Sequence, residues 1–252
     1  MHILKKMGIA GLIMALLMVA APSSAYEVNP MVIELRPTGQ GSSASGVITN
    51  SHDVPIAIEI QVFARTQNPD GSDDLVPEND DIIVTPPQVV IQPGESQTFR
   101  VSWVGEQAPD KERAFRLVTN QLPIRFRQEK RENYVAEVTM RYRYEVALYV
   151  QPTGTTPRAQ LQSARVFDDA EHGRILEVTI TSDGTRRAIL ENPQLELASG
   201  GLSFAIKTEQ IAPLVGLNIL PGSTRIVRMP APEGLPVGDL TGDLKTSYLV
   251  IS

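Results

Sequence analysis

Hydrophobic and polar residues alternate along an unusually long stretch of the chain, from Tyr134 to Val150. Every even position in it is apolar or aromatic, whereas Glu137, Thr139, Arg141, Arg143 and Glu145 fall on odd positions. Period-two alternation predicts a β-strand with one hydrophobic face. At ~3.3 Å per residue the stretch spans roughly 55 Å, well beyond a usual strand. One small domain can hardly cover that whole face, so we expect part of it to meet another chain.

Shorter runs of the same kind precede this stretch. Apolar residues alternate with polar ones over Ile56–Val62 and Thr98–Trp103, and turns are indicated at Asn68–Gly71 and Pro93–Gly94. Further short strands are expected at Met31–Leu35, Ala44–Thr49, Ile82–Val84, Gln88–Ile91 and Phe115–Asn120. Short strands separated by turns in this rhythm predict an immunoglobulin-like sandwich.

A second, smaller β domain is expected after a short linker, Pro152–Pro157. Its strands are predicted at Ile175–Thr181, Gln194–Leu197, Phe204–Lys207, Leu217–Leu220, Arg225–Met229 and Tyr248–Ile251. We therefore expect an all-β protein with two immunoglobulin-like β-sandwich domains, residues 26–151 and 158–252, with the long strand closing the first.

The first 25 residues have the features of a secretory signal peptide. Lys5 and Lys6 precede the apolar run Gly8–Ala20, and Ser23–Ala25 offers small residues for cleavage before Tyr26. Their removal would take away two positive charges and make the chain more negative than its overall −6, which disfavours nucleic acid and anionic membrane as partners. No later run is long enough to insert in a membrane, so we expect no membrane insertion after cleavage. The sequence has no cysteine, which excludes disulfides and thiolate chemistry.

No group of residues indicates catalysis, a cofactor or a metal. The acidic residues Asp70, Asp73, Asp74, Asp80 and Asp81 lack the spacing of a calcium loop and are more typical of a solvated hairpin. His52 and His172 are accompanied by no nucleophile motif or zinc-ligand pair. We therefore expect neither an enzyme nor a cofactor-binding or metal-binding protein.

Several motifs, in a fixed order, carry a family resemblance. Ile83–Val101 contains Thr-Pro-Pro, a hydrophobic strand, a Pro-Gly turn and a strand with arginine. Three further segments follow in order: Phe115–Leu117 with Leu122-Pro123, Arg143–Val150 followed by Pro152, and Leu220–Arg225. Together these segments resemble the PapD-like periplasmic pilus chaperones. Ala64–Gln67 before a polar hairpin, and arginine in the last strand, resemble the archaic or alternative chaperone–usher group, although Ala147 stands where those relatives often have proline.

The resemblance implies a fold and a function. Such a chaperone folds as two immunoglobulin-like domains and works in the periplasm. It would cap pilus or fibre subunits by donor-strand complementation, inserting its G strand into the subunit's open groove, and deliver them to an outer-membrane usher. The donor side chains would be Ala136, Val138, Met140 and Tyr142. Tyr144, Val146 and Leu148 continue the same face and are expected in the chaperone's own core.

The family also implies an anchor for the terminal carboxylate of the subunit, formed by two basic residues in the interdomain cleft. Arg143 matches the G-strand position and lies on the odd face, and Arg36 is the nearest base for the first-strand position. A guanidinium can hold a carboxylate through two parallel hydrogen bonds. The alternative is that Arg36 and Arg141 are solvated charges on strands.

Two alternatives remain open from the sequence. Periodicity alone is equally typical of a long edge strand in an ordinary sandwich. An exported adhesin or fibre subunit would also be built from β-sandwiches, but it needs an alternating donor segment before its first strand, where we find only Tyr26–Pro30. An exposed hydrophobic strand also favours edge-to-edge pairing, so a self-dimer of the unliganded chaperone is a further expected partner.

Overall fold

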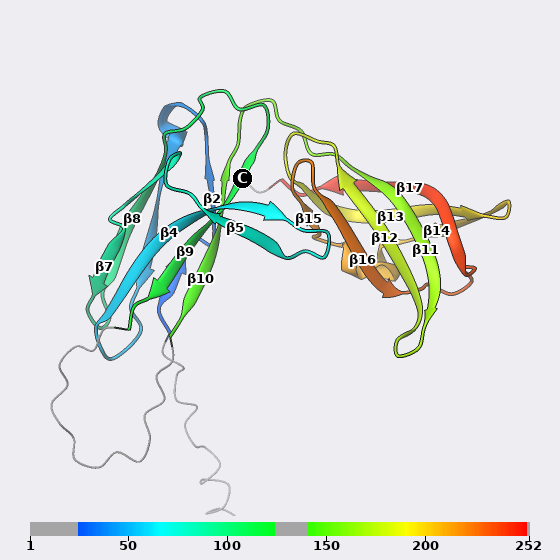
Figure 1. The fold of residues 1–252 in the computed structure, drawn as a ribbon, viewed down its shortest axis with the longest axis horizontal. Helices are drawn as coiled ribbons and strands as arrows, with labels where there is room; N and C mark the ends of the chain where they lie inside the picture. The colour runs from blue at the N-terminus through cyan, green and yellow to red at the C-terminus, as the bar shows by residue number, and fades with distance from the viewer. Residues whose placement is uncertain (1–24, 124–140, 251–252) are drawn as a thin grey trace, which may run out of the picture.

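The computed structural model describes residues 25–123 and 141–250. Nearly all of its regular structure is β (Figure 1). The strands of the first domain are β1 (Glu27–Asn29), β2 (Val32–Leu35), β3 (Ser43–Thr49), β4 (Ile56–Gln67), β5 (Asp73–Pro77), β6 (Ile82–Thr85), β7 (Gln88–Ile91), β8 (Ser96–Trp103), β9 (Arg113–Gln121) and β10 (Arg143–Val150). A short 3-10 turn, Gly39–Ser42, separates β2 from β3.

These strands form the two layers of a sandwich. One sheet has the order β1-β3-β8-β6, and the other has the order β2-β10-β9-β4-β5, with β7 also pairing with β4. The first strand of the chain is divided between the layers, because β1 pairs with β3 whereas β2 runs parallel to β10 in the opposite sheet. A cis peptide bond joins Asn29 to Pro30 at this switch.

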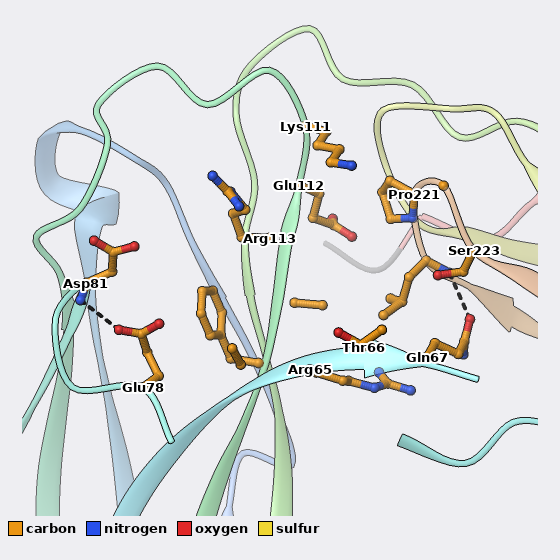
Figure 2. Close-up of a pocket in the computed structure, with 15 residues that line it drawn as sticks. Arg65, Thr66, Gln67, Glu78, Asp81, Lys111, Glu112, Arg113, Pro221 and Ser223 are labelled. Atoms are coloured by element: carbon orange, nitrogen blue, oxygen red, sulfur yellow. Dashed lines mark hydrogen bonds between the residues drawn. The ribbon is translucent and has the colours of Figure 1, made fainter. Parts of the chain in front are cut away.

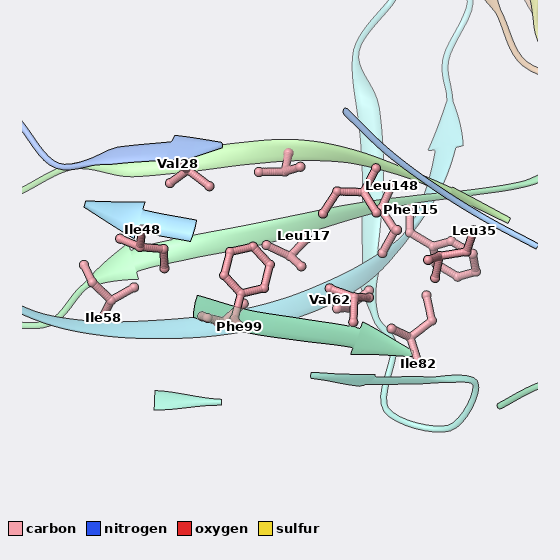
Figure 3. Packing of buried hydrophobic residues seen from close by; sticks show 14 of the residues in the cluster. Val28, Leu35, Ile48, Ile58, Val62, Ile82, Phe99, Phe115, Leu117 and Leu148 are labelled. Atoms are coloured by element: carbon pink, nitrogen blue, oxygen red, sulfur yellow. The ribbon is translucent and has the colours of Figure 1, made fainter. Parts of the chain in front are cut away.

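The core of this sandwich comes from the inward positions predicted by alternation. Phe99 and Val101 of β8 face Leu117 of β9 and the even-numbered residues of β4 across the interior (Figure 3). Gly46 of β3 is required there, since any Cβ would collide with the Phe99 ring. The hairpin predicted at Asn68–Gly71 forms between β4 and β5, and Pro86-Pro87 separates β6 from β7.

The second domain contains β11 (Ala159–Asp169), β12 (Gly173–Ser182), β13 (Ala188–Ser199), β14 (Leu202–Ile206), β15 (Asn218–Ile219), β16 (Thr224–Pro230) and β17 (Gly238–Tyr248). Two 3-10 turns, Thr208–Gln210 and Ala212–Leu214, precede β15. The strand order is β14-β13-β17-β11-β12-β16, and β15 pairs with β13. β17 pairs with β11 at its start and with β13 afterwards, so one strand joins both layers.

The expected fold class is confirmed, but several strands were missed or misplaced. The final strand was expected at Tyr248–Ile251, but β17 ends at Tyr248 and begins at Gly238. Its sequence contains two glycines and several charges, so it lacks the hydrophobic alternation that marks a half-buried strand. β5 and β11 were also missed. The residues 124–140, which include the first part of the long alternating stretch, lie outside the described residues.

Candidate functional site

Strand β10 is paired unequally along its two edges. On one side it pairs with β9 over its whole length, from Arg143 opposite Asn120 to Val150 opposite Arg113. On the other side β2 covers only the second half, from Ala147 to Val150. Within the described part of the chain, Arg143–Val146 therefore form an open sheet edge.

The backbone groups on this open edge can be assigned from the neighbouring bonds. The amides of Ala147 and Gln151 donate to the carbonyl oxygens of Met31 and Leu35, at 3.0 and 2.8 Å. Hydrogen-bonding directions in a strand alternate with period two, so Arg143 and Glu145 point their N–H and C=O groups to the same side. Among the residues described, no strand lies there to pair with them. These groups are a template for one more strand.

The inward face of β10 is built as expected from alternation. Val146 and Leu148 are fully buried in the core, and Tyr144 packs edge-on against Tyr26 with ring centroids 4.8 Å apart. Tyr26 donates a hydrogen bond to the Thr119 carbonyl oxygen, and burial raises the pKa of its phenol to about 12. The open edge is therefore backed by a closely packed interior.

The expected donor side chains are described only in part. Tyr142 is half-buried against the core, with its ring 5.7 Å from that of His52. Ala136, Val138 and Met140 lie outside the described residues. Their donor role stays a prediction.

The two expected anchor arginines are not brought together. Arg143 begins β10, at the end remote from the second domain and not in the interdomain cleft where it was expected. It pairs with Glu145 at 2.9 Å, with its side chain 49 % exposed. Arg36 follows β2 at the other end of β10, where it donates to the Gln151 carbonyl oxygen at 3.4 Å. At ~3.3 Å per residue the register separates them by about 25 Å. At this separation the two arginines cannot bind one carboxylate together. The expectation that Arg36 and Arg143 form a joint anchor is therefore wrong.

The outer face of β10 meets the second domain at its far end. Tyr149 is buried although it lies on the odd face, because the Arg187 guanidinium stacks on its ring 3.9 Å from the centroid. Arg187 also binds Glu34 of β2 and donates to Glu112 Oε2 at 2.6 Å. Glu112 is completely buried, so this ion cluster fixes the second domain against the end of β10.

A second set of bonds joins the β4–β5 hairpin to the second domain. Gln67 is buried and uses both ends of its amide: it donates to the Asn218 carbonyl oxygen at 3.0 Å and accepts from the Leu220 amide at 3.1 Å. Beside it, a cavity of about 420 Å³ lies between the domains, lined by Lys111, Glu112, Pro221 and Ser223 among others (Figure 2).

A compact charge cluster lies close to the tip of this hairpin, where Asp73 is paired with Gln67. Asp73 of β5 contacts Arg65 Nε at 2.7 Å and Arg116 Nη2 at 2.8 Å. Burial alone would raise the pKa of Asp73, but the two arginines outweigh burial and lower it. For Glu112, burial outweighs the attraction of Arg187 and raises the pKa.

Sequence patterns do not predict this junction. Ala64–Gln67 resembles a family motif, but nothing in its sequence indicates a contact with the second domain. Arg187, Glu112 and Glu34 are distant in sequence and follow no spacing that indicates contact. The acidic residues considered for calcium are not gathered into a site, since no group of three potential ligands occurs in the described ranges.

Replacing Arg187 tests the junction. Arg187→Met should lower the free energy of unfolding by about 3–5 kcal/mol, because Glu112 is left buried without its counter-ion. Chemical denaturation measures the loss, with Arg228→Met as control: Arg228 pairs with Glu177 but is 66 % exposed, so less than about 1 kcal/mol is expected. Adding Glu112→Gln to Arg187→Met should restore part of the loss. Equal losses in the two single variants would contradict this role.

The pKa shifts of Asp73 and Glu112 predict opposite effects of acid. The lowered pKa of Asp73 contributes stability that is lost as the pH falls through its folded value, whereas the raised pKa of Glu112 favours the folded state at low pH and loses that contribution as the pH rises. On acidification from about pH 7 to about pH 3, Asp73→Asn should lose less stability than the unmodified protein and Glu112→Gln should lose more. Unfolding curves over this range check both signs, and a shift of the same sign in both variants would refute the assignment.

Comparison with known proteins agrees with this architecture. Residues 29–156 match the family model described as pili and flagellar-assembly chaperone, PapD N-terminal domain. A search of curated protein sequences found no match.

Solved structures share the whole fold at low sequence identity. The CsuC–CsuE chaperone–tip subunit complex from the archaic chaperone–usher Csu pili of Acinetobacter baumannii matches with a TM-score of 0.56 at 17 % identity, covering 88 % of this chain and 98 % of that chain. The class 5 fimbriae chaperone CfaA matches with a TM-score of 0.55 at 14 % identity, covering 86 % of this chain and 98 % of that chain. The complex of SafA pilin with the SafB chaperone from Salmonella enterica matches with a TM-score of 0.51 at 15 % identity, covering 91 % of this chain and 93 % of that chain. With the family match across the sandwich that contains β10, these findings show that the chain belongs to the PapD-like pilus-assembly chaperones.

Proposed function

We propose that this protein is a periplasmic chaperone that caps pilus or fibre subunits by donor-strand complementation and delivers them to an outer-membrane usher. The observation that carries the proposal is the open edge of β10 at Arg143–Val146. A subunit strand added there would complete the bonds of Arg143 and Glu145 and continue the sheet beyond β2.

The physical basis is β-strand addition, a recognised mode of chaperone–pilin binding. Main-chain bonds supply affinity that is independent of side chains, while alternate side chains fill pockets of the partner. In this chain the pocket-filling residues would be Ala136, Val138, Met140 and Tyr142, on the face that Tyr144 and Val146 continue into the chaperone core. The inward packing of β10 would hold the donor segment in register.

Arg143 would anchor the carboxylate end of the subunit. Its guanidinium lies on the odd face, is half-exposed and has Glu145 as its ion-pair partner. A subunit carboxylate would have to compete with Glu145 for it. Arg36 is too far along β10 to take part in the same contact.

The proposed periplasmic location rests on the predicted signal peptide. Residues 1–25 would direct export, and the absence of cysteine is compatible with a periplasmic life without disulfides. Among the described residues, no helix is long and apolar enough to cross a membrane. Without a subunit, we propose that two copies cover their open strands by dimerising.

Met140→Asp tests the donor segment. A charge placed in an apolar subunit pocket costs several kcal/mol if unpaired, so capture should fail while the chaperone still folds. The measurement is recovery of a co-expressed pilus subunit on tagged chaperone, beside a thermal melt of the free variant. Thr139→Asp is the matched control, because it places the same charge on the opposite face. Undiminished capture by Met140→Asp would disprove the donor assignment.

Arg143→Ala tests the anchor. Binding should weaken by about 2–5 kcal/mol, largely because the subunit carboxylate would be left without its partner. Arg143→Lys should be intermediate, since it keeps the charge and loses the two-pronged geometry. The Arg36→Ala variant is the control, because it removes the same charge about 25 Å away, and it should bind the subunit normally. Titration of a purified subunit gives the affinities, and a loss in Arg36→Ala equal to that in Arg143→Ala would place the anchor elsewhere.

A further inference from the structure

A buried tyrosine from the beginning of the first domain reaches the point where β10 starts. Tyr26 directly precedes β1, and its side chain is completely buried in the core of the first sandwich. Its phenol donates to the Thr119 carbonyl oxygen at 2.8 Å and lies 3.3 Å from the Tyr142 carbonyl oxygen. Thr119 belongs to β9, and Tyr142 directly precedes β10. One hydroxyl group therefore contacts both strands at the end of their ladder.

The phenol is held in place from more than one side. The hydroxyl of Thr119 lies 2.9 Å from the phenol oxygen, which can accept its proton while it donates to the carbonyl. The Tyr26 ring packs edge-on against Tyr144, the second residue of β10. Burial raises the pKa of Tyr26 to about 12, so the phenol keeps its proton and remains a donor at neutral pH.

Gln121 at the end of β9 binds the same piece of backbone. Its amide donates to the Tyr142 carbonyl oxygen at 3.1 Å, and its Oε1 accepts from the Tyr142 amide at 3.4 Å. The strand register ends at Arg143 opposite Asn120. The contacts of Tyr26 and Gln121 with Tyr142 thus extend the pairing of β9 and β10 past the end of the ladder.

These contacts lie where the proposed donor segment joins β10. In the proposed function the pocket-filling residues are Ala136, Val138, Met140 and Tyr142. A slip of one residue would turn each of these side chains to the opposite face, so the register at Tyr142 decides what the subunit meets. Since β2 does not reach Arg143–Val146, this part of β10 is held by β9 and by its packing in the core. The end of a ladder paired along one edge is the part that opens most readily.

We propose that Tyr26 is a positioning residue for subunit binding: its phenol clamps the start of β10 against β9 and holds the donor segment in register. This inference rests on the proposed donor-strand function and adds to it a residue outside β10. Tyr26 is too deeply buried to touch a subunit and acts through Thr119 and Tyr142. A strand start that is ordered in advance lowers the cost of binding. Without the clamp, only the fraction of molecules with an ordered start would bind, and the affinity falls by that fraction.

Tyr26→Phe tests the clamp, because it removes the hydroxyl and keeps the ring. Titration with a purified pilus subunit should show a dissociation constant raised by about 5–10-fold. Ile82→Val is the matched control: it trims another buried residue of the same core, on β6 in the opposite sheet. Both variants should melt about 2–4 °C below the unmodified protein, but Ile82→Val should keep full affinity. Undiminished affinity in Tyr26→Phe, or an equal loss of affinity in Ile82→Val, would overturn the proposal.

Thr119→Val provides a second variant of nearly the same shape. It removes the hydroxyl that bonds the phenol, so its affinity should fall in the same direction as that of Tyr26→Phe. The double variant should bind no more weakly than Tyr26→Phe alone, because the two hydroxyls act through one contact. Additive losses of affinity would contradict the clamp.

Amide hydrogen exchange in the free monomer tests the clamp without a subunit. The Tyr144 amide, which faces β9, should exchange about tenfold faster in Tyr26→Phe relative to the Leu148 amide deeper in the same ladder. A change that only destabilises the whole domain would accelerate both amides equally, and that result would refute local clamping.

Met140→Asp separates failure of the clamp from failure of the proposed function. Subunit binding by Met140→Asp would refute the donor segment itself. Loss of binding in Met140→Asp with full affinity in Tyr26→Phe would refute the clamp alone.

Discussion

The unequal hydrogen bonding of β10 is the constraint from which the rest of this structure follows. β9 holds the strand along its whole length, but β2 reaches only its second half, because the first strand of the chain changes sheets between β1 and β2. The strand is thus fixed firmly by one edge and by its buried side chains, while the other edge stays open at Arg143–Val146. A rigid strand with an open edge can offer its backbone to a partner with little ordering cost.

The second half of β10, which is paired along both edges, lies at the contact that holds the two domains together. Tyr149 is sandwiched between the first domain and Arg187, and Glu112 and Glu34 bind that arginine. A buried ion cluster of this kind contributes little net stability compared with an apolar contact, but it demands specific geometry. Its natural effect is to set one orientation of the second domain relative to β10, and Gln67 restricts that orientation further through its two backbone contacts.

The sequence predicted those features that depend on local pattern. Alternation places Val146 and Leu148 on the hydrophobic face, which the family resemblance assigns to the core beyond the donor segment, and composition predicts the turn at Asn68–Gly71. Tyr149 shows where this reasoning stops: alternation puts it on the solvent side, and only contact with Arg187 buries it. Arg36 was paired with Arg143 by analogy, but the register between β2 and β10 decides their separation, and a single sequence does not contain the register. β17 was largely missed because a strand shared between two layers need not alternate.

The central claim is that the open edge of β10 receives a strand from a pilus subunit. Amide hydrogen exchange at Arg143 and Glu145, measured by NMR on the chaperone alone, at a concentration low enough to keep it monomeric, and in complex with a subunit, tests it most directly. The account predicts that both amides exchange quickly in the free monomer and become strongly protected in the complex. Tyr144 and Val146, whose amides face β9, should be protected in both states and serve as internal references. A stable complex in which Arg143 and Glu145 still exchange as fast as in the free monomer would contradict the account.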